Sequence, residues 1–397
     1  SYKAKHTTDH CLFMLIFLAP LALLAALWLW HPLLRTGKKY YAIAVIATAI
    51  FGALPAMLIW AIRNTTVSYT AIAYLQVPAG WLFASIAGAW AVAVLRDTVA
   101  VLGKMLRYPG VAKILWQPHY TLIVMSAMLL VCGHGAIQGL RVPAVREQEL
   151  PLAKLPRELD GLRIAVIADL HASPINNAFY VREVVERTNA AKPDLIVLPG
   201  DLVDGDVATQ AHNIAPLADL YAPHGVWVAP GNHEYYSGFD DWAKVFGQLG
   251  LPYLVNQAHT VQVRGKRLTL SGVGDPAYAQ SHNTGGGVPP DIVSVAQQAQ
   301  AQQAQFHILL GHQPKMAREY AAQHSVHLHI AGHTHGGHIR GFDQWVVAPF
   351  NKGFVRGRYT VGDMTLFVSN GAGLWAGFTQ RLGVPAAIDV LVLRSTQ

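Results

Sequence analysis

The first 140 residues of this 397-residue chain are dominated by four long apolar stretches, at about 11–30, 41–62, 70–95 and 119–140. A helix needs about 20 residues to cross the roughly 30 Å hydrocarbon core of a bilayer, and each stretch is close to that length or longer. Three or five spans are the alternative counts. The pattern therefore predicts an all-α transmembrane region of about four helices in residues 1–140.

The apolar N-terminal region raises the hydrophobic content of the whole chain and lowers its charged content. Overall 52% of the residues are hydrophobic and 13% are charged, whereas the composition from about residue 150 onward is that of an ordinary globular protein. The two cysteines cannot build a disulfide framework or a cysteine-rich metal site. The net charge of +7 lies mainly in short segments beside the apolar stretches. This distribution indicates contact with lipid headgroups and argues against a nucleic-acid partner.

The basic residues also predict a membrane orientation. The loops 31–40 and 96–118 carry more Lys and Arg than the segments on the opposite side. Short cytoplasmic loops are enriched in these residues, so the pattern favours a multi-pass protein of a bacterial inner membrane with its soluble part on the periplasmic side. The oligomeric state stays open.

The soluble part is expected to be an α/β domain over 158–397, reached through a Pro-punctuated connector at 141–157. Short apolar runs that end in a polar residue alternate with helical periodicity. The runs are LRIAVIAD, DLIVLPGD, GVWVAPG, FHILLGH and VHLHIAGH. RYTVGDMTLFVSNGAG and AAIDVLVL read as antiparallel strands. This order predicts a sandwich whose functional groups lie at the carboxyl ends of strands.

Five loops directly after predicted strands present metal-ligating side chains. They contain Asp169 and His171, then Asp201, then Asn232 and His233, then His312, and finally His333 and His335. Any one of these loops alone would be weak evidence, but five in succession are not expected by chance. Carboxylate, amide and imidazole ligands together suit Mn²⁺, Fe or Zn²⁺ better than Ca²⁺ or Mg²⁺. Seven such groups, with one carboxylate shared, are enough for two divalent metals that clamp a phosphoryl group.

These motifs, in this order, resemble the calcineurin-like metallophosphoesterase superfamily, and in particular its YkuE-type branch. The segments that carry the resemblance are LDGLRIAVIADLH, GDLVDG, APGNHEYY, GHTHGGHIR and LGVPAAIDVLVL, which span about 158 to the C-terminus. The helical region resembles the membrane-attached members of that branch. The resemblance implies a four-layer αββα sandwich and a metal-dependent phosphoric ester hydrolase with two divalent ions, with Mn²⁺ expected before Fe or Zn²⁺.

The resemblance also implies a role for each site residue. Asp169, His171 and His335 would hold one metal, while Asn232, His312 and His333 would hold the other. Asp201 would bridge both. His233 would contact the phosphate and protonate the leaving group, after attack by a metal-bridging hydroxide and without a covalent enzyme intermediate.

Several neighbouring residues are open to two interpretations. Asp204 would either orient a ligand histidine or form a turn, and Glu234 would either support its loop or cap the next segment. His338, Arg340 and Arg356 are candidates for substrate binding. The glycine-rich segment 282–290 is expected to border the pocket as a loop.

The substrate is the least determined part. Basic and aromatic residues follow the last ligand loop, namely Arg340, Phe350, Lys352, Phe354, Arg356, Arg358 and Tyr359. They fit a membrane lipid or lipid-linked phosphate ester or pyrophosphate; the alternative is a hairpin whose aromatic side chains pack inward. A second hypothesis is a phosphodiesterase for a soluble nucleotide-like substrate, with the helices only an anchor. A third is a catalytically inactive membrane scaffold or sensor.

Overall fold

The computed structural model describes residues 20–64, 69–280, 286–375 and 377–396. The chain divides into two compact units, Ser1–Gln138 with Ala376–Gln380, and Gly139–Trp375 with Arg381–Gln397. The first is the helical unit and the second is the catalytic unit, and each has hydrophobic cores of its own.

The helical unit consists of an apolar helix Pro20–Arg35 followed by α2 (Lys38–Asn64), α3 (Tyr69–Met105), α4 (Pro109–Leu115) and α5 (Pro118–Leu140). Three of its segments are long and apolar enough to cross a membrane, namely Lys38–Leu58, Ala73–Met105 and Pro118–Leu140. They match the second, third and fourth expected spans, although the third runs ten residues past the expected end at 95. The first expected span begins in residues 1–19, outside the described part of the chain, and its described remainder is shorter than a span.

Small residues and indole hydrogen bonds hold these helices together. Ala26, Ala89 and Ala93 are buried in one cluster, where their size lets the helix backbones approach closely. Trp30 Nε1 donates to Thr48 Oγ1 at 2.8 Å, and Trp81 Nε1 donates to the carbonyl of Leu129 at 2.8 Å. The polar edge of each indole is therefore satisfied inside an apolar unit.

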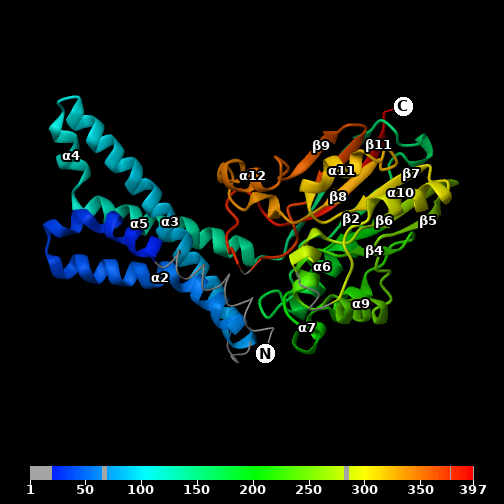
Figure 1. The fold of residues 1–397 in the computed structure, drawn as a ribbon, viewed down its shortest axis with the longest axis horizontal. Coiled ribbons are helices and arrows are strands. Elements are labelled where there is room, and N and C mark those ends of the chain that lie inside the picture. The colour runs from blue at the N-terminus through cyan, green and yellow to red at the C-terminus, as the bar shows by residue number, and fades with distance from the viewer. Residues whose placement is uncertain (1–19, 65–68, 281–285, 376, 397) are drawn as a thin grey trace. The chain divides into compact units, whose positions relative to one another are not determined.

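The catalytic unit contains two sheets (Figure 1). The first has the strand order β1-β11-β2-β3-β4, with bounds Ala144–Leu152, Ala387–Ser395, Arg163–Val166, Leu195–Pro199 and Val226–Ala229. β11 pairs parallel with β1 and antiparallel with β2. The segment 141–157, interpreted from sequence as a connector, therefore contributes an edge strand to this sheet. Sequence reading expected some extended structure here but could not place it in a sheet, because the partner of β1 lies more than 230 residues away.

The second sheet has the order β5-β6-β7-β8-β10-β9, with bounds Gln257–Val263, Lys266–Gly272, Phe306–Leu310, Leu328–Ala331, Met364–Val368 and Gly357–Val361. β6, β7, β8 and β10 pair in parallel, while β5 and β9 pair antiparallel at the two edges. The strands predicted from FHILLGH, VHLHIAGH and RYTVGDMTLFVSNGAG are present in this sheet, and AAIDVLVL forms β11 of the first sheet. The C-terminal strands are only partly antiparallel, because β10 pairs in parallel with β8 and β11 in parallel with β1.

Alternating side chains place the two sheets face to face between helices. Along β2, Ile164 and Val166 pack into a core shared with the second sheet, whereas Ala165 packs against helices, because successive strand side chains point to opposite faces. The helices on that outer face are α6 (Ala178–Ala190), α7 (Val207–Ile214) and α9 (Phe239–Gln248). Those on the second sheet are α10 (Ile292–Ala301) and α11 (Ala317–Ala321). The four-layer αββα sandwich is confirmed.

Two buried histidines in the second sheet predict acid sensitivity of the catalytic unit. His307 hydrogen bonds to Ser271 Oγ at 2.6 Å, and His329 Nε2 to the carbonyl of Gly311 at 2.7 Å. Burial lowers the pKa of each from 6.5 to about 4. The unfolded chain therefore binds protons that the folded chain does not, so the free energy of unfolding falls as the pH drops from 6.5 towards 4, by about 1.4 kcal/mol per pH unit and histidine.

The measurement is the melting temperature at pH 7.5 and pH 5.0 for the wild type and His329→Gln, whose amide can still donate to Gly311. The variant should lose fewer degrees between the two pH values than the wild type. Equal losses would show that His329 does not titrate on unfolding.

Candidate dinuclear metal centre

The candidate ligands follow strands of both sheets. Asp169 and His171 follow β2, Asp201 follows β3, and Asn232 opens the short helix α8 (Asn232–Tyr236) after β4. From the second sheet, His312 follows β7, and His333 and His335 follow β8. Carboxyl ends of parallel strands share one edge of their sheet, so each sheet delivers its ligand loops to a single place. The seven residues predicted from sequence are brought together.

A left-handed backbone conformation recurs at these loops. Five of the seven residues have a positive φ: Asp169 at 51°, His171 at 46°, Asp201 at 55°, His333 at 73° and His335 at 49°. Residues other than glycine rarely adopt this conformation, and it persists where neighbouring structure enforces it. Backbone hydrogen bonds from Asp169 to Gly200 and from His171 to Asp201 tie the first two loops together at 3.1 and 3.0 Å. The strain therefore aims the side chains out of the strand direction and into the site.

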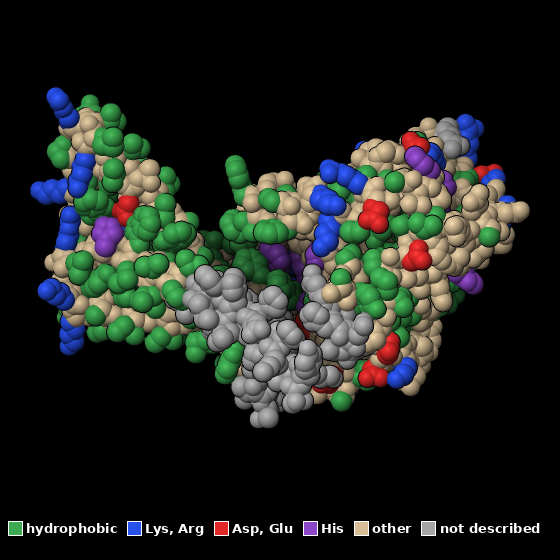
Figure 2. Space-filling model, viewed as in Figure 1, with side chains coloured by type: hydrophobic (Ala, Val, Ile, Leu, Met, Phe, Trp, Pro, Cys, Tyr) green, Lys and Arg blue, Asp and Glu red, His purple; other side chains and the backbone are tan. Residues whose placement is uncertain are grey.

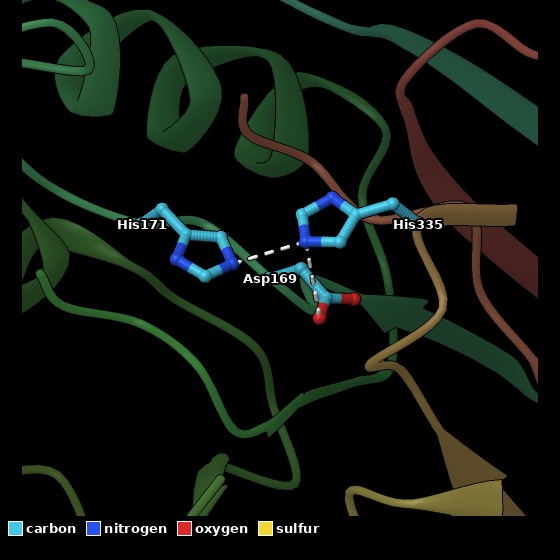
Figure 3. Close-up of side chains that lie close together, drawn as sticks. All are labelled: Asp169, His171 and His335. Atoms are coloured by element: carbon cyan, nitrogen blue, oxygen red, sulfur yellow. Dashed lines mark hydrogen bonds and ion pairs between the residues drawn. The ribbon is translucent and has the colours of Figure 1, made fainter. Parts of the chain in front are cut away.

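Asp169, His171 and His335 form one group whose ligand atoms all lie within 4.8 Å of one another (Figure 3). The two Nε2 atoms of the histidines are 3.1 Å apart, and Nε2 of His335 is 3.8 Å from Oδ1 of Asp169. All three side chains are buried. This is the set expected to hold the first metal.

A second group contains Asp201, His312 and His333. Nε2 of His312 is 3.0 Å from Oδ2 of Asp201, and the amide oxygen of Asn232 is 2.9 Å from Nδ1 of His333. The same Asp201 oxygen is 3.9 Å from Nε2 of His171, in the first group. Asp201 therefore lies between the two groups, where the predicted bridging role requires it. The bridging role itself stays a prediction.

The donor set fits divalent metals. Oδ2 of Asp169 is buried and has no hydrogen-bond partner among the described residues, as expected for an atom that awaits a cation. Nδ1 of His312 lies 2.8 Å from the carbonyl of Pro199, an arrangement that leaves Nε2 for a metal. Carboxylate and imidazole together suit Mn²⁺, Fe or Zn²⁺.

Asp204 contacts two histidines of the site at once. Its Oδ1 is 2.9 Å from Nδ1 of His171 and 2.5 Å from Nδ1 of His233. Burial alone would lower the pKa of His233, but the carboxylates of Asp201 and Asp204 raise it to about 9. The carboxylate of Asp204 thus favours the protonated ring, the form that the predicted proton donor requires, and the donor role stays a prediction. Two interpretations of Asp204 were open, a turn and the orientation of a ligand histidine. Its contact with His171 agrees with the second.

Glu234 supports the ligand loops, as expected. Its two carboxylate oxygens accept from the backbone N–H groups of Gly231, Asp201 and Leu202 at 2.7 to 3.0 Å. Close backbone approach also explains a glycine at 332, since a Cβ there would lie 2.5 Å from Oδ2 of Asp169. Both features hold the loops at a fixed separation.

The three candidate substrate residues lie in different environments. His338 is buried and its ring stacks on that of His335, with centroids 5.0 Å apart. Arg340 is exposed, and its Nε donates to the carbonyl of Gly383 at 3.2 Å. Arg356 pairs with the carboxylate of Asp343 and donates to the carbonyl of Gly336 at 2.8 Å. These contacts give Arg356 a supporting position beneath the last ligand loop; substrate binding by any of the three stays a prediction.

The expected loop 282–290 is described only from residue 286 onward, and residues 282–285 lie outside the described part of the chain. Gly287 N donates to Asp240 Oδ1 at 3.1 Å, and the carbonyl of Val288 accepts from the hydroxyl of Tyr235 at 2.6 Å. The described half is therefore held against α8 and α9.

Sequence reasoning missed two residues of the site. Arg381 is fully buried and donates to Nδ1 of His335 at 3.0 Å, as well as to the carbonyls of His335, Asn370 and Gly373 at 2.7 to 2.9 Å. Trp375 is 37% exposed, and its ring centroid is 6.4 Å from that of His233 and 6.5 Å from that of His335. Neither residue belongs to a strand-end motif, so no local signal marked them.

Two variants distinguish the predicted metal ligand Asp201 from the predicted proton donor His233. Asp201→Asn should lower the metal content below that of the wild type, because a neutral amide replaces the carboxylate that faces both groups. His233→Ala should keep the metal and lose about 10²-fold or more in turnover. Metal per chain by mass spectrometry and hydrolysis of bis-p-nitrophenyl phosphate give the two readouts. Equal metal loss in both variants would make His233 a ligand.

A third variant tests Arg381. Arg381→Met removes the guanidinium that holds the ring of His335 and three carbonyls, and we expect metal affinity to fall about 10- to 100-fold, as is typical for residues behind a metal ligand. Arg182→Met, at an exposed position of α6, is the matched control. Metal affinity is measured by titration of the stripped protein, and circular dichroism checks the fold. A folded Arg381→Met protein with unchanged affinity would contradict the assignment.

Comparisons with known proteins agree with this geometry. Residues 162–337 match the family model described as calcineurin-like phosphoesterase. An uncharacterized metallophosphoesterase of Helicobacter pylori is 32% identical over 268 residues, which are 67% of this chain and 68% of the relative. A transmembrane protein with metallophosphoesterase domain from Bos taurus is 30% identical over 71% of this chain and 64% of its own.

The uncharacterized metallophosphoesterase YkuE of Bacillus subtilis is 27% identical over 63% of this chain and 85% of its own, which bears out the predicted branch. The extent of these matches, together with five ligand loops on one αββα sandwich, shows that the chain belongs to the calcineurin-like metallophosphoesterase family, whose members hydrolyse phosphate esters at a dinuclear metal site.

Proposed function

We propose that this protein hydrolyses a phosphate ester or pyrophosphate on a membrane lipid or lipid-linked molecule. The observation that carries the proposal is an exposed, mainly aromatic surface that follows the last ligand loop in sequence, called here the aromatic surface. It is formed by Phe342, directly before η7 (Asp343–Val347), by Trp345 and Val346 on η7, and by Phe350 on α12 (Ala348–Phe350). Trp345 is 83% exposed and Phe350 is 78% exposed. Figure 2 shows hydrophobic side chains standing out over α12, with histidines beside them.

The chain ties this aromatic surface to the site. His338, which stacks on His335, lies four residues before Phe342. Arg356 then links the two ends, because it bonds both Gly336 in the ligand loop and Asp343 at the start of η7. A movement of the aromatic surface relative to the metals would break these bonds.

The charges around the aromatic surface favour an anionic partner. Asp343 is the only acidic residue between 335 and 360, and it is buried and paired. The exposed Arg340, Lys352 and Arg358 border the aromatic residues in sequence. Aromatic side chains flanked by cations are typical of segments that lie at the headgroup level of a membrane. Of the aromatic residues expected in this region, Phe354 is buried while Phe350 is exposed. The inward-packed interpretation therefore applies to Phe354, and the lipid-contact interpretation is open for Phe350.

The residues of the site have separable tasks in such a reaction. When bound, the metal pair supplies an activated water and a clamp on the phosphoryl oxygens. His233, whose Nδ1 lies 2.5 Å from Oδ1 of Asp204, donates a proton to the leaving oxygen. The rings of Trp375 and His338 lie beside those of His233 and His335, with centroids 6.4 and 5.0 Å apart respectively.

The surroundings of the enzyme follow from the same proposal. In this proposal the chain is a multi-pass protein of a bacterial inner membrane with the lipid bilayer as its permanent partner, and its three long apolar helices support the membrane attachment. The excess of Lys and Arg in 31–40 and 96–118 supports a periplasmic catalytic unit. A tethered site meets lipid substrates at a raised effective concentration. No basic stripe that would track a nucleic acid occurs in the sequence.

The test replaces the aromatic side chains. Trp345→Ser with Phe350→Ser should lower kcat/KM on phospholipid phosphate esters in vesicles by about tenfold or more, the equivalent of about 1.4 kcal/mol of lost interfacial contact. Hydrolysis of soluble bis-p-nitrophenyl phosphate should stay unchanged. The double variant Phe179→Ser with Tyr221→Ser, which removes two other exposed aromatic residues of the catalytic unit, is the control. Wild-type protein that turns over soluble nucleotides and no lipid would establish the soluble-substrate alternative instead.

A further inference from the structure

The helical unit contains a cavity of about 310 Å³ that has no connection to phosphoester chemistry. It lies between the helix Pro20–Arg35, α3, α4 and α5, and the residues that line it include Leu29, Ala89, Ala93, Val99, Leu115 and Val124. Its accessible wall is apolar. An apolar cavity does not hold ordered water, which needs two to four polar partners, and takes apolar guests instead.

A polar cluster borders this cavity, with Arg96 and Thr121 among the lining residues. Arg96 lines it and forms an ion pair with Asp97 at 2.8 Å. Asp97 also accepts from the indole N–H groups of Trp28 and Trp116, each at 2.7 Å, and NH1 of Arg96 donates to Thr121 at 2.9 Å. The charges of Arg96 and Asp97 neutralise each other, and their bonds fix the surrounding helices around the cavity.

The same end of the unit carries a surplus of positive charge. Asp97 is the only acidic residue between 20 and 140, whereas the segments 31–40 and 96–118 contain six basic residues besides Arg96 (Arg35, Lys38, Lys39, Lys104, Arg107 and Lys113). Figure 2 shows Lys and Arg side chains gathered at the end of the helical unit that carries α4. Nζ of Lys104 lies 4.0 Å from the ring centroid of Trp116, directly after the cavity residue Leu115. Uncompensated cations therefore lie beside an apolar cavity.

We propose that this cavity binds one anionic glycerophospholipid of the surrounding bilayer. An acyl chain lies against Val99, Ala93 and Leu115, and the headgroup phosphate is held by Lys104 and Lys113. An apolar cavity and a basic rim at one end of a membrane helix bundle together match the two parts of such a lipid, and basic pockets between helices are a known mode of anionic headgroup recognition. The lipid is a resident of the helical unit and not the substrate of the catalytic unit.

Matched variants test the two halves of the site. Val99→Phe fills the cavity, while Val101→Phe places the same ring two residues away on α3, outside the cavity; the two valines are 43% and 49% exposed. Lys104→Gln with Lys113→Gln removes the charges, and Arg182→Gln with Lys244→Gln removes two exposed charges of the catalytic unit. The full-length protein is delipidated in non-ionic detergent and titrated with dioleoyl phosphatidylglycerol or dioleoyl phosphatidylcholine, and bound lipid is counted by native mass spectrometry.

We expect phosphatidylglycerol to bind the wild type at least fivefold more tightly than phosphatidylcholine. Val99→Phe should weaken both lipids at least fivefold, and Val101→Phe should not. The lysine pair should lose only the preference for phosphatidylglycerol, which the exposed control keeps. Equal binding to Val99→Phe and Val101→Phe, or a preference that survives loss of both lysines, would overturn the proposal. Lys104 and Lys113 are exposed, so we expect their variants to fold. These variants therefore test the charge preference of the site even if Val99→Phe does not fold. Native mass spectrometry counts bound lipid and requires no enzyme activity. The result is therefore independent of whether the catalytic unit hydrolyses a lipid substrate.

Discussion

Asp169 and Asp201 follow the ends of two neighbouring parallel strands, β2 and β3, and both of their carboxylates are buried. Burying a charged carboxylate raises the free energy of the folded state unless cations or hydrogen-bond donors surround it. Burial and the nearby Asp201 accordingly raise the pKa of Asp169. The histidines His312, His233 and His171 instead hold the pKa of Asp201 well below its usual range despite its burial. This concentration of negative charge accounts for the imidazoles that converge on the site and makes the site suitable for divalent cations.

The strained loops follow from the same requirement. To face each other across the gap between two sheets, the side chains must leave the strand direction at once, and a left-handed residue is the shortest way to achieve this. Gly332 allows the loop after β8 to approach Asp169, and Glu234 gathers the N–H groups of the loops after β3 and β4. The four-layer core beneath provides the rigid support that keeps such conformations in place.

The exposed aromatic surface and the cavity in the helical unit relate to a membrane in different ways. Phe342, Trp345, Val346 and Phe350 project from the catalytic unit and would meet the headgroup level. The cavity lies between helices, is partly open at its surface, and would hold part of a lipid within the bilayer. Both combine apolar side chains with uncompensated cations, the combination that an anionic lipid satisfies and water does not.

Sequence alone determined the apolar helices, the succession of strands along the catalytic unit and the ligand loops. These features depend on local hydrophobic periodicity and on residues that directly follow a strand. Glu234 could also be placed, since its partners lie in adjacent loops. Tertiary structure alone decided that β1 is an edge strand, that Arg381 holds His335, that Trp375 faces His233, and that Trp345 and Phe350 point outward while Phe354 packs inward. Each of these depends on a partner or a face that folding brings together across the chain, and no local spacing encodes it.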